Sequence, residues 1–165
     1  MMVQAAAWTT EPDRKDWEAH GLKCAIRRVR DAGHLCGYVG IPKEHPLHGV
    51  GYYDECPALE PLREQVRYAR NDEGISPEMA LEVHGGITYS DNHVAGGKPD
   101  GLWWFGFDCA HSGDLSPGLQ SHLRDAGAFT SLLGGEYRDM AYVTRETENL
   151  AKQLCSLKEG IQDAR

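Results

Sequence analysis

Alternation of hydrophobic and polar residues predicts two strands in the first quarter of the chain. Residues 22–29 alternate, residues 31–33 (Asp-Ala-Gly) are typical of a turn, and residues 34–41 alternate again. Because Pro42 lacks the N–H group that a sheet ladder needs, the second strand should end there. We therefore expect a β-hairpin, preceded by an arm over residues 1–20 that packs through its tryptophans.

The same alternation predicts further strands in the middle of the chain. Residues 81–84 and 87–90 alternate on either side of Gly85-Gly86, where the backbone should break or bulge. Residues 91–101 are rich in loop-forming types, and a new strand starts at Trp103. Strands joined in this way should lie side by side and antiparallel.

The strand that starts at Trp103 is rich in aromatic residues. Trp103, Phe105 and Phe107 are two apart, so all three should face the core on one side of the sheet. Trp104 points to the opposite face, where it could stack on a ligand. Polar residues that could take part in catalysis follow where this strand ends, from Asp108 to Asp114.

Helical spacing appears between the two groups of strands and again near the end of the chain. In residues 58–71 the apolar residues recur at helical spacing, while Arg63, Arg67 and Arg70 share another face that is either solvated or recognises phosphate. Short helices are expected over 77–80 and 119–126, and a short strand over 140–143. Finally, Thr144 is expected to cap a helix that runs to about Leu157.

These elements together predict an α+β fold with a mostly antiparallel sheet and a C-terminal helix. The 165 residues correspond to one average domain, so residues 1–165 are expected to form a single domain. Within it, residues 43–75 form an insertion composed of a functional loop and a helix. The loop part, residues 43–54, is dense in histidine, tyrosine and acidic residues and too rich in glycine for a helix.

Composition narrows the classes of function. The formal net charge of −8 and a pI near 5.4 argue against a protein that grips long nucleic acid, whereas a small anionic ligand remains compatible. We find no apolar stretch long enough for a membrane helix and no signal peptide, which favours a cytoplasmic location. The five cysteines are scattered without a Cys-x-x-Cys pair, which is typical of reduced thiols in the core.

Four histidines stand out among the eight in the chain because they lie beside glycine, proline or acidic residues at strand ends and in loops. The predicted catalytic residues are these four and two aspartates, namely His45, His48, His84, His111, Asp108 and Asp114. An antiparallel return of the strand from Trp103 should bring Asp108 toward His84. We therefore expect the imidazoles of His84 and His111 to share one pocket.

Three kinds of chemistry fit these residues. Histidines can act as acid and base on a phosphodiester, with the aspartates holding their tautomers and arginines neutralising the phosphate. Alternatively, His84, Asp108 and His111 are suitable metal ligands that Asp114 could orient, although none of their spacings is an established ligand motif. For that reason no cofactor is predicted, a divalent metal is kept as the alternative, and activity is expected to survive chelation. A Cys109 nucleophile is the weakest option, since Cys109 and Asp108 point to opposite faces of a regular strand.

A ligand held at such a site would be contacted by aromatic, hydroxyl and guanidinium groups. The predicted ligand-binding residues are Tyr52, Tyr53, Thr88, Tyr89, Trp104, Arg63 and Arg67.

Three motifs carry a resemblance to a known group of proteins: Gly-Ile-Pro-x-x-His-Pro-Leu at 40–47, Val-His-Gly-Gly-Ile-Thr-Tyr at 83–89 and Gly-Phe-Asp-Cys-Ala-His-Ser-Gly-Asp at 106–114. The chain resembles a group of small proteins of tailed phages and prophages. Phage proteins of this size include counter-defence factors, so the resemblance implies cleavage of a cyclic nucleotide immune signal in the cytoplasm of an infected bacterium. The alternatives are a non-catalytic sponge for the same ligand and a structural or assembly protein of the virion. A homo-oligomer is expected.

Overall fold

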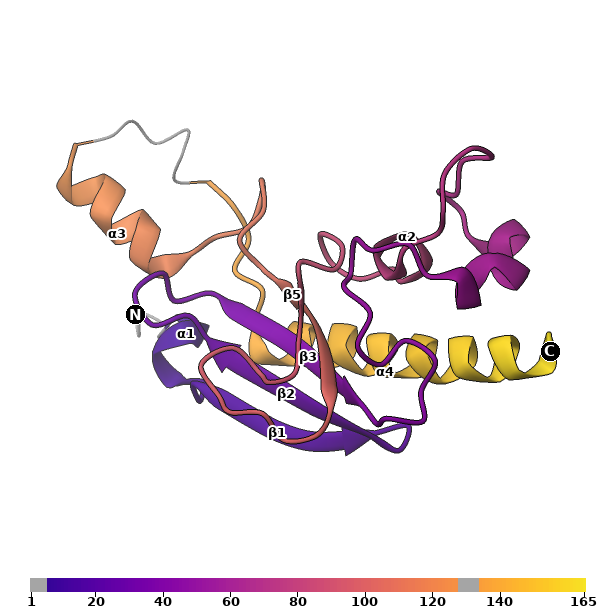
Figure 1. Cartoon of the computed structure of the whole chain (residues 1–165). Helices are drawn as coiled ribbons and strands as arrows, with labels where there is room; N and C mark the ends of the chain where they lie inside the picture. The colour runs from indigo at the N-terminus through magenta and orange to yellow at the C-terminus, as the bar shows by residue number, and fades with distance from the viewer. Residues whose placement is uncertain (1–5, 128–133) are drawn as a thin grey trace.

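The computed structural model describes residues 6–127 and 134–165, which form a single α+β domain. A five-stranded antiparallel sheet with the order β1-β2-β3-β5-β4 packs against a long C-terminal helix, α4 (Figure 1). The strands are β1 (Arg14–Ala19), β2 (Leu22–Arg28), β3 (Leu35–Ile41), β4 (Tyr89–Asp91) and β5 (Trp103–Asp108). The helices are α1 (Ala7–Thr10), the 3₁₀ helix η1 (Pro57–Gln65), α2 (Pro77–Ala80), α3 (Pro117–Asp125) and α4 (Met140–Asp163). The predicted fold class is therefore confirmed.

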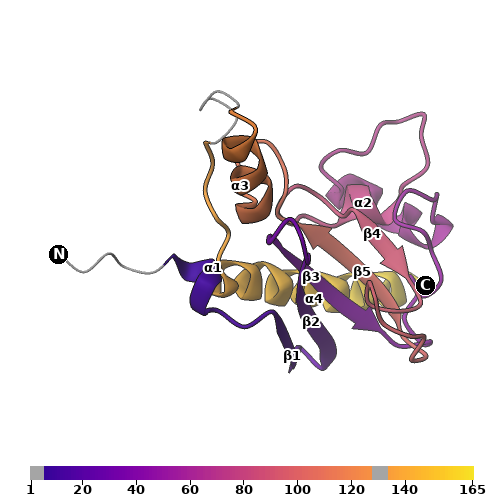
Figure 2. The same ribbon diagram turned by 90° about the vertical axis from the view of Figure 1, so that its left-hand side faces the viewer.

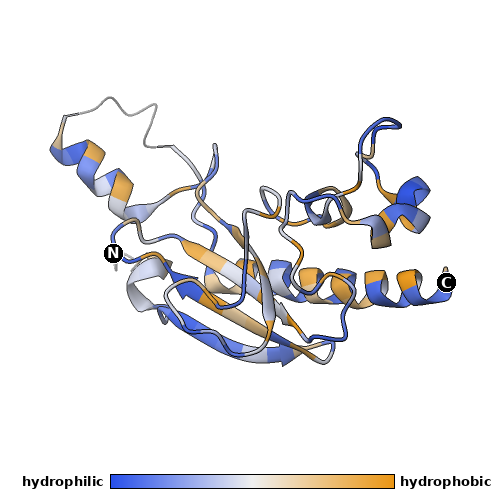
Figure 3. Cartoon of the chain, in the orientation of Figure 1, coloured by the Kyte–Doolittle hydropathy of each residue, from blue (hydrophilic) through white to orange (hydrophobic). Residues whose placement is uncertain are grey.

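The main core lies between the sheet and α4, and the alternation of the strands produces it. Phe105 and Phe107 of β5 are buried in this layer, and Trp103 packs at its edge, as the spacing predicted. The helix contributes a buried stripe that includes Leu150 and Leu154, visible as the orange bands along α4 in Figure 3. Burial of such side chains contributes about 2 kcal/mol each, which makes this layer the main source of stability.

Gly37 in the central strand β3 lets α4 lie close to the sheet. A Cβ atom at this position would overlap the Thr147 hydroxyl and the Phe107 ring. Thr147 is itself fully buried and donates its hydroxyl hydrogen to the Val143 carbonyl within α4. The helix is therefore held against β3, and with it the side chains of its first turns.

The predicted hairpin over 22–41 is confirmed as β2 and β3, but the strand β1 was missed in the arm over 1–20. This strand pairs with β2 along its whole length, from Arg14 opposite Arg27 to Ala19 opposite Leu22. The connection is His20-Gly21, both with positive φ (52° and 73°), which is the two-residue turn that hairpins favour. His-Gly is a weaker turn signal than Asn-Gly, so the hairpin escaped detection. Residues 1–5 of the arm lie outside the described residues.

The predicted strand over 81–84 is wrong, because its backbone pairs with helix side chains instead of another strand. Gln153 of α4 accepts a hydrogen bond from the Glu82 N–H (2.7 Å) and donates one to the Glu82 carbonyl (2.7 Å). In the same way, the Glu146 carboxylate accepts from the His84 N–H (3.0 Å). The alternation in this segment reflects a chain that lies along α4. Figure 2 shows α4 behind the sheet.

Two more predicted elements are wrong. The helix expected over 58–71 is limited to η1, since Pro61 inside it removes a backbone donor and disfavours an α-helix. The strand expected over 140–143 is the first turn of α4, which begins four residues before Thr144. Asp139 caps it, and its carboxylate accepts a hydrogen bond from the Tyr142 N–H (2.8 Å).

Most of the remaining predictions of local structure hold, but α4 continues to Asp163, beyond the predicted end at Leu157, and the strand predicted over 87–90 begins only at Tyr89. Helix α2 occupies 77–80, α3 covers most of 119–126, and β4 and β5 form the expected antiparallel pair with Tyr89 opposite Gly106. Among the helices of the described residues, none is both long enough and apolar enough to cross a membrane.

Candidate functional site

His84, Asp114 and Tyr142 form the centre of a polar cluster at the N-terminal end of α4. The Nε2 atom of His84 lies 2.7 Å from Oδ2 of Asp114, and its Nδ1 atom lies 2.8 Å from the Tyr142 hydroxyl. Both ring nitrogens are therefore occupied, and the ring orientation is fixed. The three residues come from separate parts of the chain, so only the fold brings them together.

Asp114 is the most heavily bonded residue of the cluster, and its side chain is 2% exposed. Besides His84, it accepts hydrogen bonds from Arg138 Nε (2.9 Å, to Oδ1) and from the backbone N–H of His111 (3.0 Å, to Oδ2). Burial acts to raise the pKa of the Asp114 carboxyl, but these hydrogen bonds outweigh it and lower the pKa below its usual range. Asp114 is therefore a carboxylate at neutral pH.

His111 lies beside His84, with 5.7 Å between the ring centroids. This distance confirms the expected proximity of the two imidazoles, although neither is among the lining residues of the adjacent cavity. The Nδ1 atom of His111 is 3.5 Å from Asp114 Oδ2 and 3.7 Å from Asp108 Oδ1, and it makes no hydrogen bond although it is buried. The side chain as a whole is 33% exposed, compared with 13% for His84, so His111 is the more accessible imidazole.

Asp108 lies at the end of β5, next to His111 but outside the tightest group. Its Oδ1 accepts from the Ala110 N–H (3.0 Å), and its Oδ2 accepts from the Thr88 hydroxyl (2.9 Å). The antiparallel pairing of β4 and β5 produces this contact, as expected for the approach of Asp108 toward the segment of His84. Thr88, predicted to bind ligand, thus orients Asp108.

Gly85 is required beside this cluster for two reasons. Its φ of +69° is a conformation that side chains rarely adopt, and a Cβ atom would overlap the His111 ring. The backbone of Gly85 therefore forms one wall against which the imidazole rests.

His45 and His48, predicted to be catalytic, lie elsewhere. His45 is buried, with Nε2 2.8 Å from the Leu154 carbonyl and Nδ1 accepting from the Leu47 N–H (3.1 Å). Leu154 and Tyr142 are twelve residues apart on α4, so His45 is separated from His84 by about 18 Å along the helix. His48 lies over Trp103, with 6.2 Å between ring centroids. The structure does not bring either histidine into the cluster.

The predicted ligand-binding aromatic residues are dispersed. Trp104 is buried on the face of the sheet opposite α4, with Nε1 bonded to Asp100, and Tyr89 donates its hydroxyl hydrogen to the His93 carbonyl. Tyr52 packs against the main core and contacts the ring of Tyr53, which is 70% exposed. The hydrogen bonds and ring contacts of these four side chains join them to residues outside the histidine cluster.

The two predicted arginines differ. Arg63 is bonded to the Glu60 carboxylate and to the carbonyls of Arg70 and Glu73, so it clamps the loop that follows η1. Arg67 instead lies over the Tyr68 ring, 5.5 Å from its centroid. Only Arg67 presents its guanidinium to a cavity.

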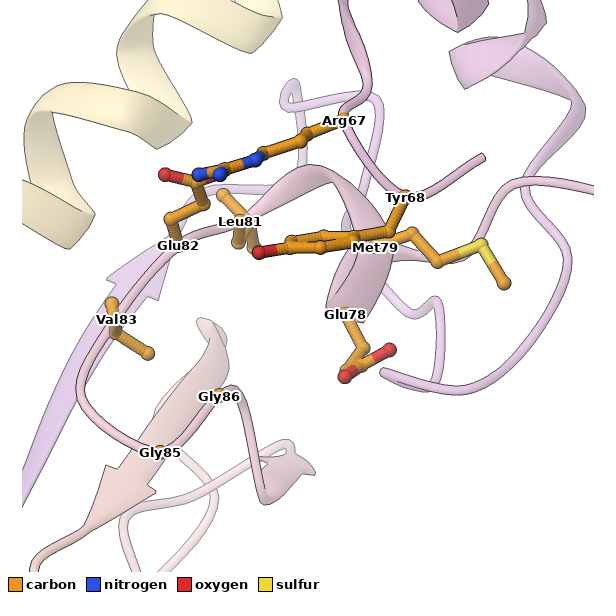
Figure 4. A pocket seen from close by; sticks show the side chains of 9 residues that line it. All are labelled: Arg67, Tyr68, Glu78, Met79, Leu81, Glu82, Val83, Gly85 and Gly86. Carbon is orange, nitrogen blue, oxygen red and sulfur yellow. The ribbon is translucent and has the colours of Figure 1, made fainter. Parts of the chain in front are cut away.

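The cavity that Arg67 lines has a volume of about 400 Å³ and lies next to the turn that contains Gly85 and Gly86 (Figure 4). Its lining includes Gly85, which lies against the His111 ring, and Gly86, while Arg67 and Tyr68 form the opposite wall. The other lining residues are Glu78, Met79, Leu81, Glu82 and Val83. The size is within the range of small-molecule sites. Two carboxylates against one guanidinium favour a group that donates hydrogen bonds, such as a base with an exocyclic amine, over a phosphate.

Cys109 does not have the properties of a nucleophile. It is 1% exposed, and its pKa is raised well above the usual thiol range, chiefly by burial and further by Asp114. It packs in the main core, in agreement with the expectation that most cysteines are core residues.

Four residues of the site were missed by sequence reasoning. Arg138 directly precedes the Asp139 cap, while Tyr142 and Glu146 are four residues apart in the first turns of α4 and so lie on one helix face, toward the cluster. The prediction of a strand over 140–143 concealed this spacing. The fourth is His34, whose pKa is lowered, chiefly by burial, while Asp108 and Asp114 act to raise it. Correct placement of the Asp139 cap would have revealed the first three.

The cluster therefore contains an ionised buried carboxylate, a fixed imidazole and an accessible imidazole next to a cavity. Such groups can transfer protons or hold a metal ion. Comparison of the chain with models of protein families, with curated proteins and with solved structures gives no match.

Proposed function

We propose that this chain hydrolyses a phosphodiester bond of a small cyclic nucleotide, in the role of a phage counter-defence protein that removes an immune signal. The reaction takes place at the cluster of His84, His111 and Asp114. The observation that carries this proposal is that the imidazoles of His84 and His111 both lie against the buried, ionised carboxylate of Asp114. His84 and Asp114 are 30 residues apart in the chain. The nucleotide itself is proposed from the resemblance to phage proteins and from the acidic charge, which disfavours long nucleic acid.

Hydrolysis requires that water attack phosphorus, that its proton be removed, and that the leaving oxygen receive a proton. The accessible His111 is suited to exchange a proton with the substrate, while Asp114 and Tyr142 hold His84 in one orientation. Arg138 is bonded to Asp114 and to Glu136, so it is already neutralised. Its role is to keep Asp114 in place, and it is not proposed as the group that neutralises the phosphate.

The adjacent cavity supports recognition of the base. Tyr68 offers an exposed aromatic face, and Glu78 and Glu82 offer acceptors for amine hydrogens. The same cavity supports a second candidate, a sponge that binds the nucleotide without cleaving it. The two candidates differ in whether the histidine cluster acts on the ligand.

The test is to incubate the purified full chain with a panel of cyclic mono-, di- and trinucleotides and to analyse the mixture by chromatography before and after heat denaturation. The proposal predicts linear products. In His111→Ala we expect turnover to fall by roughly a hundredfold, the usual effect of removing a general acid or base, while the variant still depletes free nucleotide by binding it. His48→Ala, outside the cluster, is the matched control and should keep wild-type turnover.

Other results would overturn the proposal in distinct ways. Intact nucleotide that appears only after heating identifies a sponge. No depletion of any nucleotide rejects both candidates and favours a role in the virion. Full turnover in His111→Ala removes the cluster from the mechanism.

A further inference from the structure

We infer that His84, His111 and Asp114 bind a divalent transition-metal ion of the zinc class. The inference rests on the geometry of the three side chains and does not depend on the proposed hydrolysis. One possible ligand atom from each of the three residues lies within 4.8 Å of the other two. Among the described residues, these three are the histidine, cysteine and carboxylate side chains that come together closely enough to hold one ion.

The two distances to Asp114 are close to those around a coordinated ion. Bonds of about 2.1 Å to nitrogen and oxygen place tetrahedral ligand atoms roughly 3.3 Å apart. His111 Nδ1 and Asp114 Oδ2 are 3.5 Å apart, and His84 Nε2 and Asp114 Oδ2 are 2.7 Å apart. Binding of an ion therefore requires only a small rotation of the His84 ring. The ion would take the place of the proton that lies between His84 Nε2 and Asp114 Oδ2.

The Nδ1 atom of His111 is an independent observation that points to a ligand. It is buried, it faces two carboxylates, and it has no hydrogen-bond partner. A buried polar atom without a partner costs about 1–3 kcal/mol, so native structures rarely keep one without a function. A metal ion supplies the missing partner. The lack of a Cβ atom at Gly85 gives the ring the room to occupy this position.

Two of the three candidate ligands, His84 and Asp114, are also supported at the atom that does not face the ion. His84 Nδ1 is bonded to the Tyr142 hydroxyl, and Asp114 Oδ1 is bonded to Arg138 Nε. Metal-binding imidazoles and carboxylates in proteins are held in the same way, because outer hydrogen bonds fix the tautomer and the ring orientation. Asp108, tied to Thr88 and to the Ala110 N–H, lies beside the group and outside the proposed ligand set.

The donor set selects the class of ion. Two imidazoles and one carboxylate suit zinc, iron(II) and manganese better than calcium or magnesium, which prefer oxygen ligands. Three protein ligands leave a position for water, whose pKa such an ion lowers. With the ion bound, His84 and His111 would serve as ligands in place of the acid–base role proposed above. Turnover would then be sensitive to chelation, contrary to the expectation from sequence.

The experiment uses the full chain, stripped with EDTA and titrated with Zn²⁺ by calorimetry. We expect one ion per chain, and we expect Co²⁺ to give visible absorption bands typical of nitrogen and oxygen coordination without thiolate. His111→Ala should weaken Zn²⁺ binding at least tenfold. Tyr142→Phe, which removes only the outer hydrogen bond, should weaken it by about tenfold.

Three controls keep the result specific. His48→Ala removes a histidine outside the cluster and Cys155→Ser removes the one cysteine that is not fully buried, so neither should change the affinity. Circular dichroism establishes that each variant is folded. No Zn²⁺ binding to the wild-type chain, or equal binding to His111→Ala, would overturn the inference. Zinc binding without any nucleotide turnover would leave the site standing and reject only the proposed hydrolysis.

Discussion

His45 and His111 belong to equally conspicuous motifs, yet they lie in opposite environments. Both follow the end of a strand, and both have glycine, proline or acidic neighbours. His45 is 3% exposed, and both of its ring nitrogens are bonded to backbone atoms of the core. His111 is partly open to solvent, and its buried nitrogen has no hydrogen-bond partner. The first is a structural histidine that joins a loop to α4, and the second is available for chemistry.

The difference lies in where the polar partners come from. Around His45 the partners are a neighbouring N–H and a helix carbonyl, which leave no atom free for a ligand. Around His111 the nearest polar groups are two carboxylates, at 3.5 and 3.7 Å, that other side chains hold in place. Thr88 holds Asp108, and His84 and Arg138 hold Asp114. A histidine surrounded by oriented carboxylates is the better candidate for a functional group.

The strongest test of this contrast is Asp114→Asn. The substitution removes the negative charge on which His84, His111 and Arg138 converge. It should therefore abolish turnover. It should also lower the free energy of unfolding by about 3 kcal/mol, the effect expected when one member of a buried ion pair is removed. Urea unfolding at pH 7 measures the loss. Asp72→Asn, at an exposed position, is the matched control and should change the free energy by less than about 0.5 kcal/mol.

The loss should also depend on pH. Because the folded pKa of Asp114 is lowered, its contribution to stability is fully present above the unfolded value of about 4 and disappears as pH falls through the folded pKa. Asparagine does not titrate, so the difference between wild type and Asp114→Asn should shrink below about pH 4. A difference that stays constant down to pH 3 would contradict the lowered pKa.

His45→Ala tests the structural side of the comparison. It leaves the Leu47 N–H without its acceptor and the Leu154 carbonyl without its partner, and it opens a cavity in the core. We expect the free energy of unfolding to fall by about 2–4 kcal/mol, measured by urea unfolding. Turnover and Zn²⁺ affinity per folded molecule should equal those of the wild type. A hundredfold loss of turnover in a folded His45→Ala protein would place this histidine back among the catalytic residues.

A smaller effect separates backbone strain from the position of His111. Gly85→Ala and Gly49→Ala both put a side chain at a positive φ (+69° and +82°), which costs about 1 kcal/mol. Only at Gly85 does the new methyl group overlap the His111 ring, since nothing lies within 4 Å of a Cβ at Gly49. We therefore expect similar losses of stability, but a loss of roughly tenfold or more in Zn²⁺ affinity and turnover for Gly85→Ala alone. Equal activity in the two variants would show that the Gly85 contact does not position His111.

The sequence by itself determined the elements whose signals are local. Alternation over 22–41 and from Trp103 onward depends on near neighbours and on the turn between strands, so these strand pairs were predicted. For the strand from Trp103, the face toward the core was predicted as well. Antiparallel pairing then follows from a short connection, and it brings the end of β5 near the segment that precedes β4. For this reason the proximity of His84, His111 and Asp108 could be expected before the structure was known.

Tertiary structure decided the parts whose partners are distant in the chain. Residues 81–84 alternate like a strand, but they lie along α4, where Glu146 and Gln153 replace a neighbouring strand. The contributions of Arg138 and Tyr142 depend on where α4 begins and on how closely Gly37 lets it approach the sheet. Whether a histidine is buried among backbone carbonyls or oriented by carboxylates is set by contacts that span tens of residues. A local pattern cannot encode such contacts, because the same alternation is satisfied by any apolar surface against which the segment packs.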